Sequence, residues 1–176
     1  MSRLEELILF ILDRAKNFGI KDLSEFQLFK IPYLIQCLSL KYAGTFFVPD
    51  ITFVRDKNGP ISIDIYTAIE KLIASGYVKK EIIENKKYGH PRYAHSLSGK
   101  LPKLSLNTGE TIFLDNFLAK LLLLSQVRLR EIAYKTEPMQ EIQKMERDGK
   151  IKKGVLINFS SVTVDPDIVE AYSDVQ

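Results

Sequence analysis

Residues 59–98 read GPISIDIYTAIEKLIASGYVKKEIIENKKYGHPRYAHSLS and decide the fold. A glycine–proline turn leads into a helix-forming segment at 62–75, and Gly76 ends it. Two strand-forming runs follow at 77–84 and 92–97, and Gly89 and Pro91 break the loop between them. Turn, helix and hairpin follow one another in this order in a winged helix, a scaffold that binds nucleic acid or protein. We therefore expect a compact, mainly α-helical α+β domain with a winged-helix-like hairpin.

Capping patterns predict further helices on both sides of this stretch. Each pattern pairs an N-cap side chain with a Glu or Gln three residues later, at Ser2 and Glu5, Ser24 and Gln27, and Asn107 and Glu110. The first helix should stop at Gly19 and the second at Gly44. The helix that begins at Asn107 should continue through FLDNFLAKLLLLSQV and break around 133–138, before a short helix at 138–149.

Several further segments have less regular patterns. Pro32 lies inside the second helical region, so a kink or break is expected there. Short strands are expected at 51–54 and 155–159, with a turn at RDKNGP, residues 55–60. The helices should share one core, so the interpretation is a single domain over 1–176, in which 154–176 form a C-terminal extension with an acidic end.

Composition is that of a soluble globular protein. The chain has 176 residues, of which 45% are hydrophobic and 27% charged. No apolar run reaches the roughly 20 residues that a membrane helix needs, and the N-terminus lacks the pattern of a secretory signal, so a cytoplasmic location is expected. Cys37, the single cysteine, lies in an apolar helical stretch and is interpreted as a buried structural residue.

Positive charge is concentrated in the hairpin region. Residues 79–103 hold seven Lys or Arg against two Glu, a net charge of +5 within a chain of net +3. Such a segment could bind a polyanion or an acidic protein face, or it could be an ordinary solvated hairpin. The candidate contact residues are Lys79, Lys80, Lys86, Lys87, Tyr88, His90 and Arg92.

Sequence-specific reading of DNA by the preceding helix is not favoured. Its polar residues are Thr67, Glu70 and Lys71, and it offers no Arg, Asn or Gln for base edges. The histidines His90 and His95 are expected at the surface rather than in a metal site, since no cysteine accompanies them. Phosphate loops, paired-histidine motifs and serine elbows are absent from the sequence, so we expect no enzyme, no metal and no cofactor.

A series of short motifs resembles the Panacea antitoxin-domain family, also called SocA-like. The resemblance spans about residues 24–145 and includes a helix signature, a Gly-Pro turn, a helix that closes with Leu72, Gly76 and Val78, and a later Thr-Glu-Pro element. Pro32 stands where the family usually has leucine. The motif residues, interpreted as mostly structural, are Leu28, Lys30, Tyr33, Gly59, Pro60, Tyr66, Thr136, Glu137 and Pro138.

This resemblance implies a non-enzymatic antitoxin that neutralises or escorts a neighbouring toxin by direct contact. Aromatic residues near chain breaks could contribute to such contact, although most are expected in the core: Phe26, Phe29, Tyr33, Phe46, Phe47, Phe53 and Tyr66. The alternative is a winged-helix DNA-binding regulator that uses the basic hairpin, in which long helices could pair two copies as a homodimer.

Overall fold

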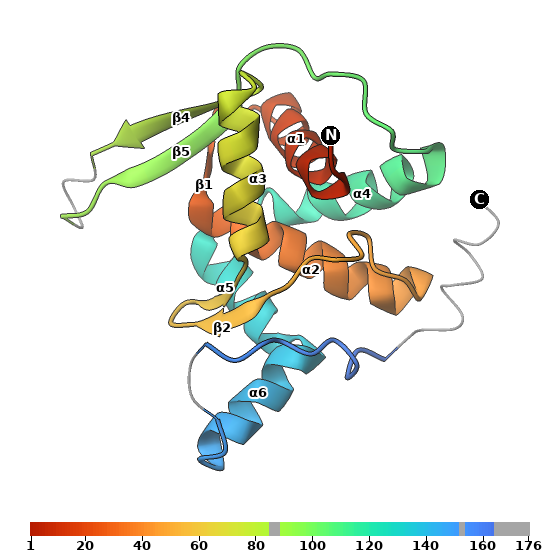
Figure 1. Cartoon of the computed structure of the whole chain (residues 1–176), viewed down its shortest axis with the longest axis vertical. Helices are drawn as coiled ribbons and strands as arrows, with labels where there is room; N and C mark the ends of the chain where they lie inside the picture. Colours follow the sequence, from red (N-terminus) through yellow and green to blue (C-terminus); the bar gives the residue numbers. More distant parts are fainter. Residues whose placement is uncertain (85–88, 152–153, 164–176) are drawn as a thin grey trace.

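The computed structural model describes residues 1–84, 89–151 and 154–163, and it is summarised in Figure 1. In chain order the elements are α1 (Arg3–Asn17), β1 (Leu23–Ser24), α2 (Glu25–Ala43), β2 (Val54–Asp56), β3 (Gly59–Ile61), α3 (Ile63–Ala74), β4 (Val78–Ile83), β5 (Arg92–Leu97), α4 (Thr108–Leu121), α5 (Gln126–Lys135) and α6 (Glu137–Arg147).

A winged-helix-like unit occupies the first 97 residues. Strands β1, β4 and β5 form one antiparallel sheet in the order β1-β5-β4, in which the short β1 pairs Leu23 with His95, and β2 and β3 form a separate two-stranded sheet. Helices α1, α2 and α3 pack beside this sheet, and β4 and β5 extend beyond the helices as a hairpin (Figure 1). The α+β class and the hairpin expected from residues 59–98 are therefore confirmed.

Local capping explains where three helices begin. At Ser2, Ser24 and Asn107 the side chain accepts from the backbone N–H three residues on, and the side chain at that third position returns a hydrogen bond to the cap. These are the capping boxes expected from the sequence, and each satisfies two backbone donors that the helix cannot satisfy itself.

Of the kink or break expected at Pro32, the break is wrong, and the kink stays a prediction. Helix α2 runs from Glu25 to Ala43 through the proline and ends at Gly44, whose φ is +69°. An interior proline costs about 3 kcal/mol in an isolated helix. Here every residue from Leu28 to Cys37 is buried, so tertiary packing offsets that cost.

Two strand boundaries also differ from expectation. In place of 51–54, strand β2 begins at Val54 and pairs with β3, so Gly59 and Pro60 lie in a strand and not in the turn. In place of a strand at 155–159, one isolated bridge joins Leu156 to Val54. Hydrogen bonds between Arg55 and Val155, and between Phe53 and Ile157, hold this segment beside β2.

The long helix expected from residue 107 is two helices. Helix α4 ends at Leu121, and α5 begins at Gln126 after the N-cap Ser125, whose hydroxyl accepts from the N–H of Arg128. A second change of direction occurs at Thr136, inside the expected break of 133–138, and the expected short helix follows as α6. The break at 122–125 allows α4 and α5 to pack on different parts of α2.

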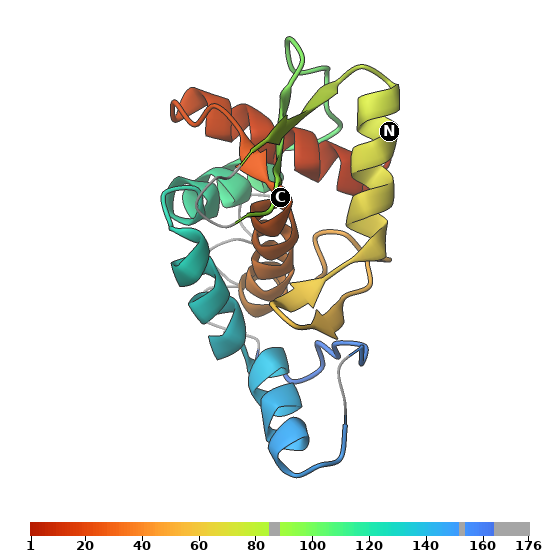
Figure 2. The ribbon, with the colours of Figure 1, turned by 90° about the vertical axis from the view of Figure 1, so that its left-hand side faces the viewer.

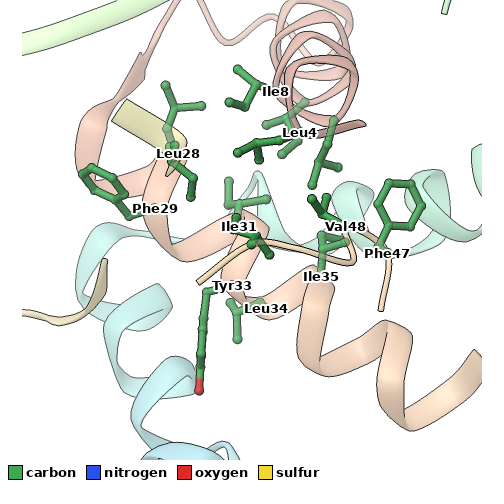
Figure 3. Close-up of a cluster of buried hydrophobic side chains, with 14 of the residues drawn as sticks. Leu4, Ile8, Leu28, Phe29, Ile31, Tyr33, Leu34, Ile35, Phe47 and Val48 are labelled. Carbon is green, nitrogen blue, oxygen red and sulfur yellow. The ribbon is translucent and has the colours of Figure 1, made fainter. Parts of the chain in front are cut away.

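Helix α2 is the centre of the core. Figure 3 shows Leu28, Ile31 and Ile35 of α2 facing Leu4 and Ile8 of α1 in one buried cluster. In Figure 2, α3 lies on one side of α2, and α4 and α5 lie on the other. None of the described helices has the length and apolar character of a membrane-spanning segment.

A buried amide holds the loop that follows α2. Gln36 is 1% exposed, and its amide group donates to the carbonyl of Val48 and accepts from the N–H of Val48, both at 2.8 Å. The loop containing Phe47 and Val48 is thereby fixed against α2, on the path to β2.

Replacing Gln36 by Met keeps the side-chain volume and removes both hydrogen bonds. Two buried backbone groups then lose their partner, so we expect a loss of about 2–4 kcal/mol in the free energy of unfolding, measured by urea denaturation. Lys57→Met at an exposed position is the control and should change stability by less than about 0.5 kcal/mol. A loss below about 1 kcal/mol for Gln36→Met would contradict this account of the loop.

Candidate functional site

The motif residues converge on the first half of α2. Lys30 is 1% exposed, and its ammonium donates to the carbonyl of Pro60 at 2.8 Å. Its Nζ also lies 4.7 Å from the ring centroid of Phe26. Gly59 has φ +96°, and a Cβ there would meet the side chains of Tyr134 and Lys30 at 3.4–3.6 Å. The Gly-Pro pair therefore provides a carbonyl and a close approach for the buried lysine.

A second contact of the same kind lies at the joint between α5 and α6. Tyr33 is fully buried, and its hydroxyl lies 2.7 Å from Oγ1 of Thr136. The Thr136 hydroxyl donates to the carbonyl of Ala133, so Tyr33 is the donor to Thr136. Thr136 ends α5 and begins α6, and Glu137 and Pro138 form the first turn of α6.

These contacts give most of the motif residues a structural role. Leu28 is fully buried in the core, and Pro138 is buried at the start of α6. Tyr66 packs edge-on against Phe29 at 4.6 Å, and it is the motif residue with a large exposed fraction, 41%. Within this set, Tyr66 is the most exposed side chain, while Thr136 and Glu137 are half-buried.

Burial governs the titration of the groups in this region. It lowers the pKa of Lys30 to about 8, while the nearby Asp56 acts in the opposite direction. It raises the pKa of the Tyr33 hydroxyl and raises the pKa of the Cys37 thiol to about 12. Cys37 is buried as expected, and a protonated, inaccessible thiol is a poor nucleophile.

Two of the candidate hairpin cations are neutralised by acids of the helical body. Lys80 of β4 lies 3.2 Å from a carboxylate oxygen of Glu70 on α3 and 3.7 Å from one of Glu25 on α2. Arg92 of β5 lies 2.7 Å from a carboxylate oxygen of Asp22. The expected basic surface is therefore weaker than the count of lysines and arginines indicates.

The remaining hairpin candidates divide into two groups. Lys79 and His90 are exposed. Lys86, Lys87 and Tyr88 lie outside the described residues. The expectation that His95 lies at the surface is wrong, because it is 0% exposed in β5 between β1 and β4. Burial, with the nearby Lys80, lowers the pKa of His95 and favours the neutral imidazole.

The outer face of α3 and the adjoining face of the hairpin carry exposed apolar side chains. Ile63 is 73% exposed and lies one turn from Tyr66 on α3. Ile82 is 67% and Tyr93 is 37% exposed, and the two are a cross-strand pair, so they project from the same face. We call these four residues the α3–hairpin face.

Lys80 joins the two halves of the α3–hairpin face. Its ammonium bonds to Glu70 on α3 and lies 4.8 Å from the ring centroid of Tyr93 on β5. The polar residues Thr67, Glu70 and Lys71 are exposed beside Tyr66, so α3 presents one acid and one base to its surroundings. The apolar residues Ile63, Ile82 and Tyr93 were not among the sequence candidates, although the alternation Val78–Lys80–Ile82 places Ile82 on the Lys80 face.

In the described part of the chain, no three His, Cys, Asp or Glu side chains gather in a way that could hold a metal ion. Comparisons with protein-family models, with curated proteins and with solved structures find no match to this chain.

Because Lys30 is buried, we expect it to make the free energy of unfolding depend on pH. The pKa of Lys30 is about 8 in the folded chain and 10.5 in its ordinary environment. Below pH 8 the side chain is charged in both the folded and the unfolded state, and burying that charge lowers the free energy of unfolding. Above pH 10.5 the side chain is neutral in both states, so this cost is absent. The free energy of unfolding of the wild type, minus that of Lys30→Met, should therefore rise between pH 8 and 10.5, by up to about 1.4 kcal/mol per pH unit.

Denaturant titrations at several pH values measure this difference. Cys37, with a pKa of about 12 in the folded chain, weakens both proteins at high pH and cancels in the comparison. Lys57→Met is the matched control, because it removes an ammonium group from the surface of the protein. A flat difference for Lys30→Met across this range would show that the Lys30 ammonium is not desolvated.

Proposed function

We propose that this chain is a non-enzymatic, protein-binding domain of the antitoxin type, which contacts a partner toxin through the α3–hairpin face. The observation that carries the proposal is the exposure of Ile63 and Tyr66 on α3 and of Ile82 and Tyr93 on the hairpin, two elements that Lys80 connects through Glu70 and the Tyr93 ring. Large apolar side chains on a shared exposed face are typical of protein interaction sites, and tyrosine is enriched among the residues that dominate binding energy.

Electrostatics support a protein partner over a duplex. A helix that enters the major groove needs side chains that reach base edges and cations that reach phosphates. The outer face of α3 holds Thr67, Glu70 and Lys71, and Glu70 already pairs with Lys80. Placing Glu70 and the apolar Ile63 against phosphates would bring a carboxylate close to other negative charges and gain few hydrogen bonds.

The resemblance to the Panacea family supports the narrower assignment to an antitoxin. The motif residues Lys30, Gly59, Pro60, Tyr33 and Thr136 come from distant parts of the sequence and meet around α2. A set of motifs that fixes the scaffold leaves the exposed surface free to vary. This arrangement suits a family whose members meet different toxins.

Co-expression with the product of each adjacent gene tests the antitoxin assignment. We expect one adjacent product to inhibit growth and this chain to restore it, with the two proteins forming a complex. Ile63→Glu should weaken that complex at least tenfold and abolish the rescue, because a carboxylate would be buried at the interface. Titration calorimetry on the purified pair provides the affinity.

Leu123→Glu is the matched control for this experiment. Leu123 is 69% exposed at the end of α4, so the change adds the same charge away from the α3–hairpin face. Equal weakening by both substitutions would remove the α3–hairpin face from the proposal. Sedimentation of the chain alone tests whether a second copy of the chain occupies the α3–hairpin face. A homodimer that is lost in Ile63→Glu would assign the face to that second copy.

A DNA-binding regulator is the second candidate, and the winged-helix-like order of helices and strands favours it. Fluorescence anisotropy with a random duplex at low and moderate salt decides between the two. We expect weak binding that changes little in a Lys79/Lys86/Lys87 triple alanine variant. Arg92 is left in place because its ion pair with Asp22 contributes to the fold. Steeply salt-dependent binding that the variant loses would establish the regulator instead.

A further inference from the structure

A groove with an apolar floor lies on the side of α2 that faces away from α3. It is formed by the second half of α2 with α4 and α5, which Figure 2 shows on the opposite side of α2 from α3. Its volume is about 500 Å³, which is within the roughly 300–1,000 Å³ of small-molecule sites. The apolar floor consists of Leu34, Leu38, Phe117, Leu121, Leu124 and Ile132.

The dimensions of the groove favour an extended chain. Along α2 it reaches from Leu34 to Tyr42, which is about 12 Å at the rise of an α-helix. Tyr42 and Phe117 stack with ring centroids 5.5 Å apart and an interplanar angle of 10°, forming one flat wall. A single hydrocarbon chain can lie along this length on the apolar floor.

Positive charge surrounds the opening. Lys41, Lys120 and Lys135 line the groove, and none of them forms a salt bridge within residues 1–84, 89–151 and 154–163. Arg128 also lines it, but its guanidinium is 2.8 Å from a carboxylate oxygen of Glu131. Glu137 is the acidic lining residue. Three lysines without a carboxylate partner around an apolar floor complement a ligand with a chain and an anionic end.

We propose that this groove binds an amphiphilic carboxylate, in which a hydrocarbon chain lies on the apolar floor and the carboxylate is held by the lysines at the rim. Burial of the chain supplies the affinity, and the charge of Lys41, Lys120 and Lys135 selects the anion. The site is separate from the α3–hairpin face, and the inference does not depend on the proposed antitoxin function.

Calorimetric titration of the full chain with dodecanoate, below the concentration at which it forms micelles, tests the proposal. We expect one site per chain and an affinity at least tenfold higher than for dodecyltrimethylammonium, which has the same chain and the opposite charge. Octanoate should bind more weakly than dodecanoate, because less apolar surface is buried. Equal affinity for the anion and the cation would overturn the proposal.

Two variants locate the binding. Leu38→Trp fills the groove and should abolish dodecanoate binding, with thermal unfolding used to confirm that the variant is folded. A Lys41/Lys120/Lys135 triple Gln variant should lose at least tenfold in affinity for dodecanoate. The Lys57/Lys71/Lys79 triple Gln variant has the same net charge and should bind as the wild type. Unchanged binding in a folded Leu38→Trp protein, or equal loss in both triple variants, would contradict the assignment.

An acidic peptide is the competing occupant. Residues 164–176 read VDPDIVEAYSDVQ, with four acidic residues and no basic residue. A synthetic peptide of this sequence provides the probe, titrated into the same full-length protein. If the peptide binds in a manner that Leu38→Trp abolishes, while dodecanoate does not bind, the groove belongs to an acidic peptide and the proposal is wrong.

Discussion

The hydrogen bond from the buried Lys30 ammonium to the carbonyl of Pro60 is the constraint on which the position of α3 depends. An ammonium that is 1% exposed is costly unless a polar group faces it, and the Pro60 carbonyl lies 2.8 Å away. Because β3 ends at Ile61 and α3 begins at Ile63, this contact holds the start of α3 near α2, where Tyr66 also packs on Phe29. Glycine is favoured at position 59 because its φ is +96°, a conformation that other residues rarely adopt.

The parts of the fold that depend on near neighbours in the sequence could be predicted. Capping boxes at Ser2, Ser24 and Asn107 involve residues three apart, and the hairpin after Gly76 follows from two adjacent runs of strand-forming residues. The parts that failed depend on distant packing. Pro32 is tolerated because the surrounding turns of α2 are fully buried, and that burial involves residues from both ends of the chain.

The division between α4 and α5 is an intermediate case. The run LLLLSQV contains no glycine or proline, so its apolar residues favour a continuous helix. Ser125 is nevertheless the N-cap of α5, and its hydroxyl accepts from the N–H of Arg128. A serine that follows four leucines could have located the break, but serine is also common inside helices, and the choice depends on how α5 packs against α2.

The candidate site shows the same division between local and distant causes. That Lys30, Gly59 and Pro60 hold the fold could be anticipated, since a lysine among apolar residues and a Gly-Pro pair have structural roles. The neutralisation of Lys80 and Arg92 could not, because Glu25, Glu70 and Asp22 precede them by 10 residues or more. Net charge over a segment counts residues and takes no account of which acids the fold brings to them.

The α3–hairpin face and the groove lie on opposite sides of α2 and differ in their electrostatics. On the α3 side, the apolar α3–hairpin face surrounds a lysine that is already paired, so binding there depends mainly on shape and apolar burial. On the α4–α5 side, three lysines without carboxylate partners in the described chain line an apolar groove, and this charge underlies the proposal of an anionic ligand. Because α2 is buried from Leu28 to Cys37 and packs on both sides, a ligand in the groove leaves the α3–hairpin face accessible. Under the two proposals, a protein partner on the α3–hairpin face and a small anion in the groove would not compete for the same surface.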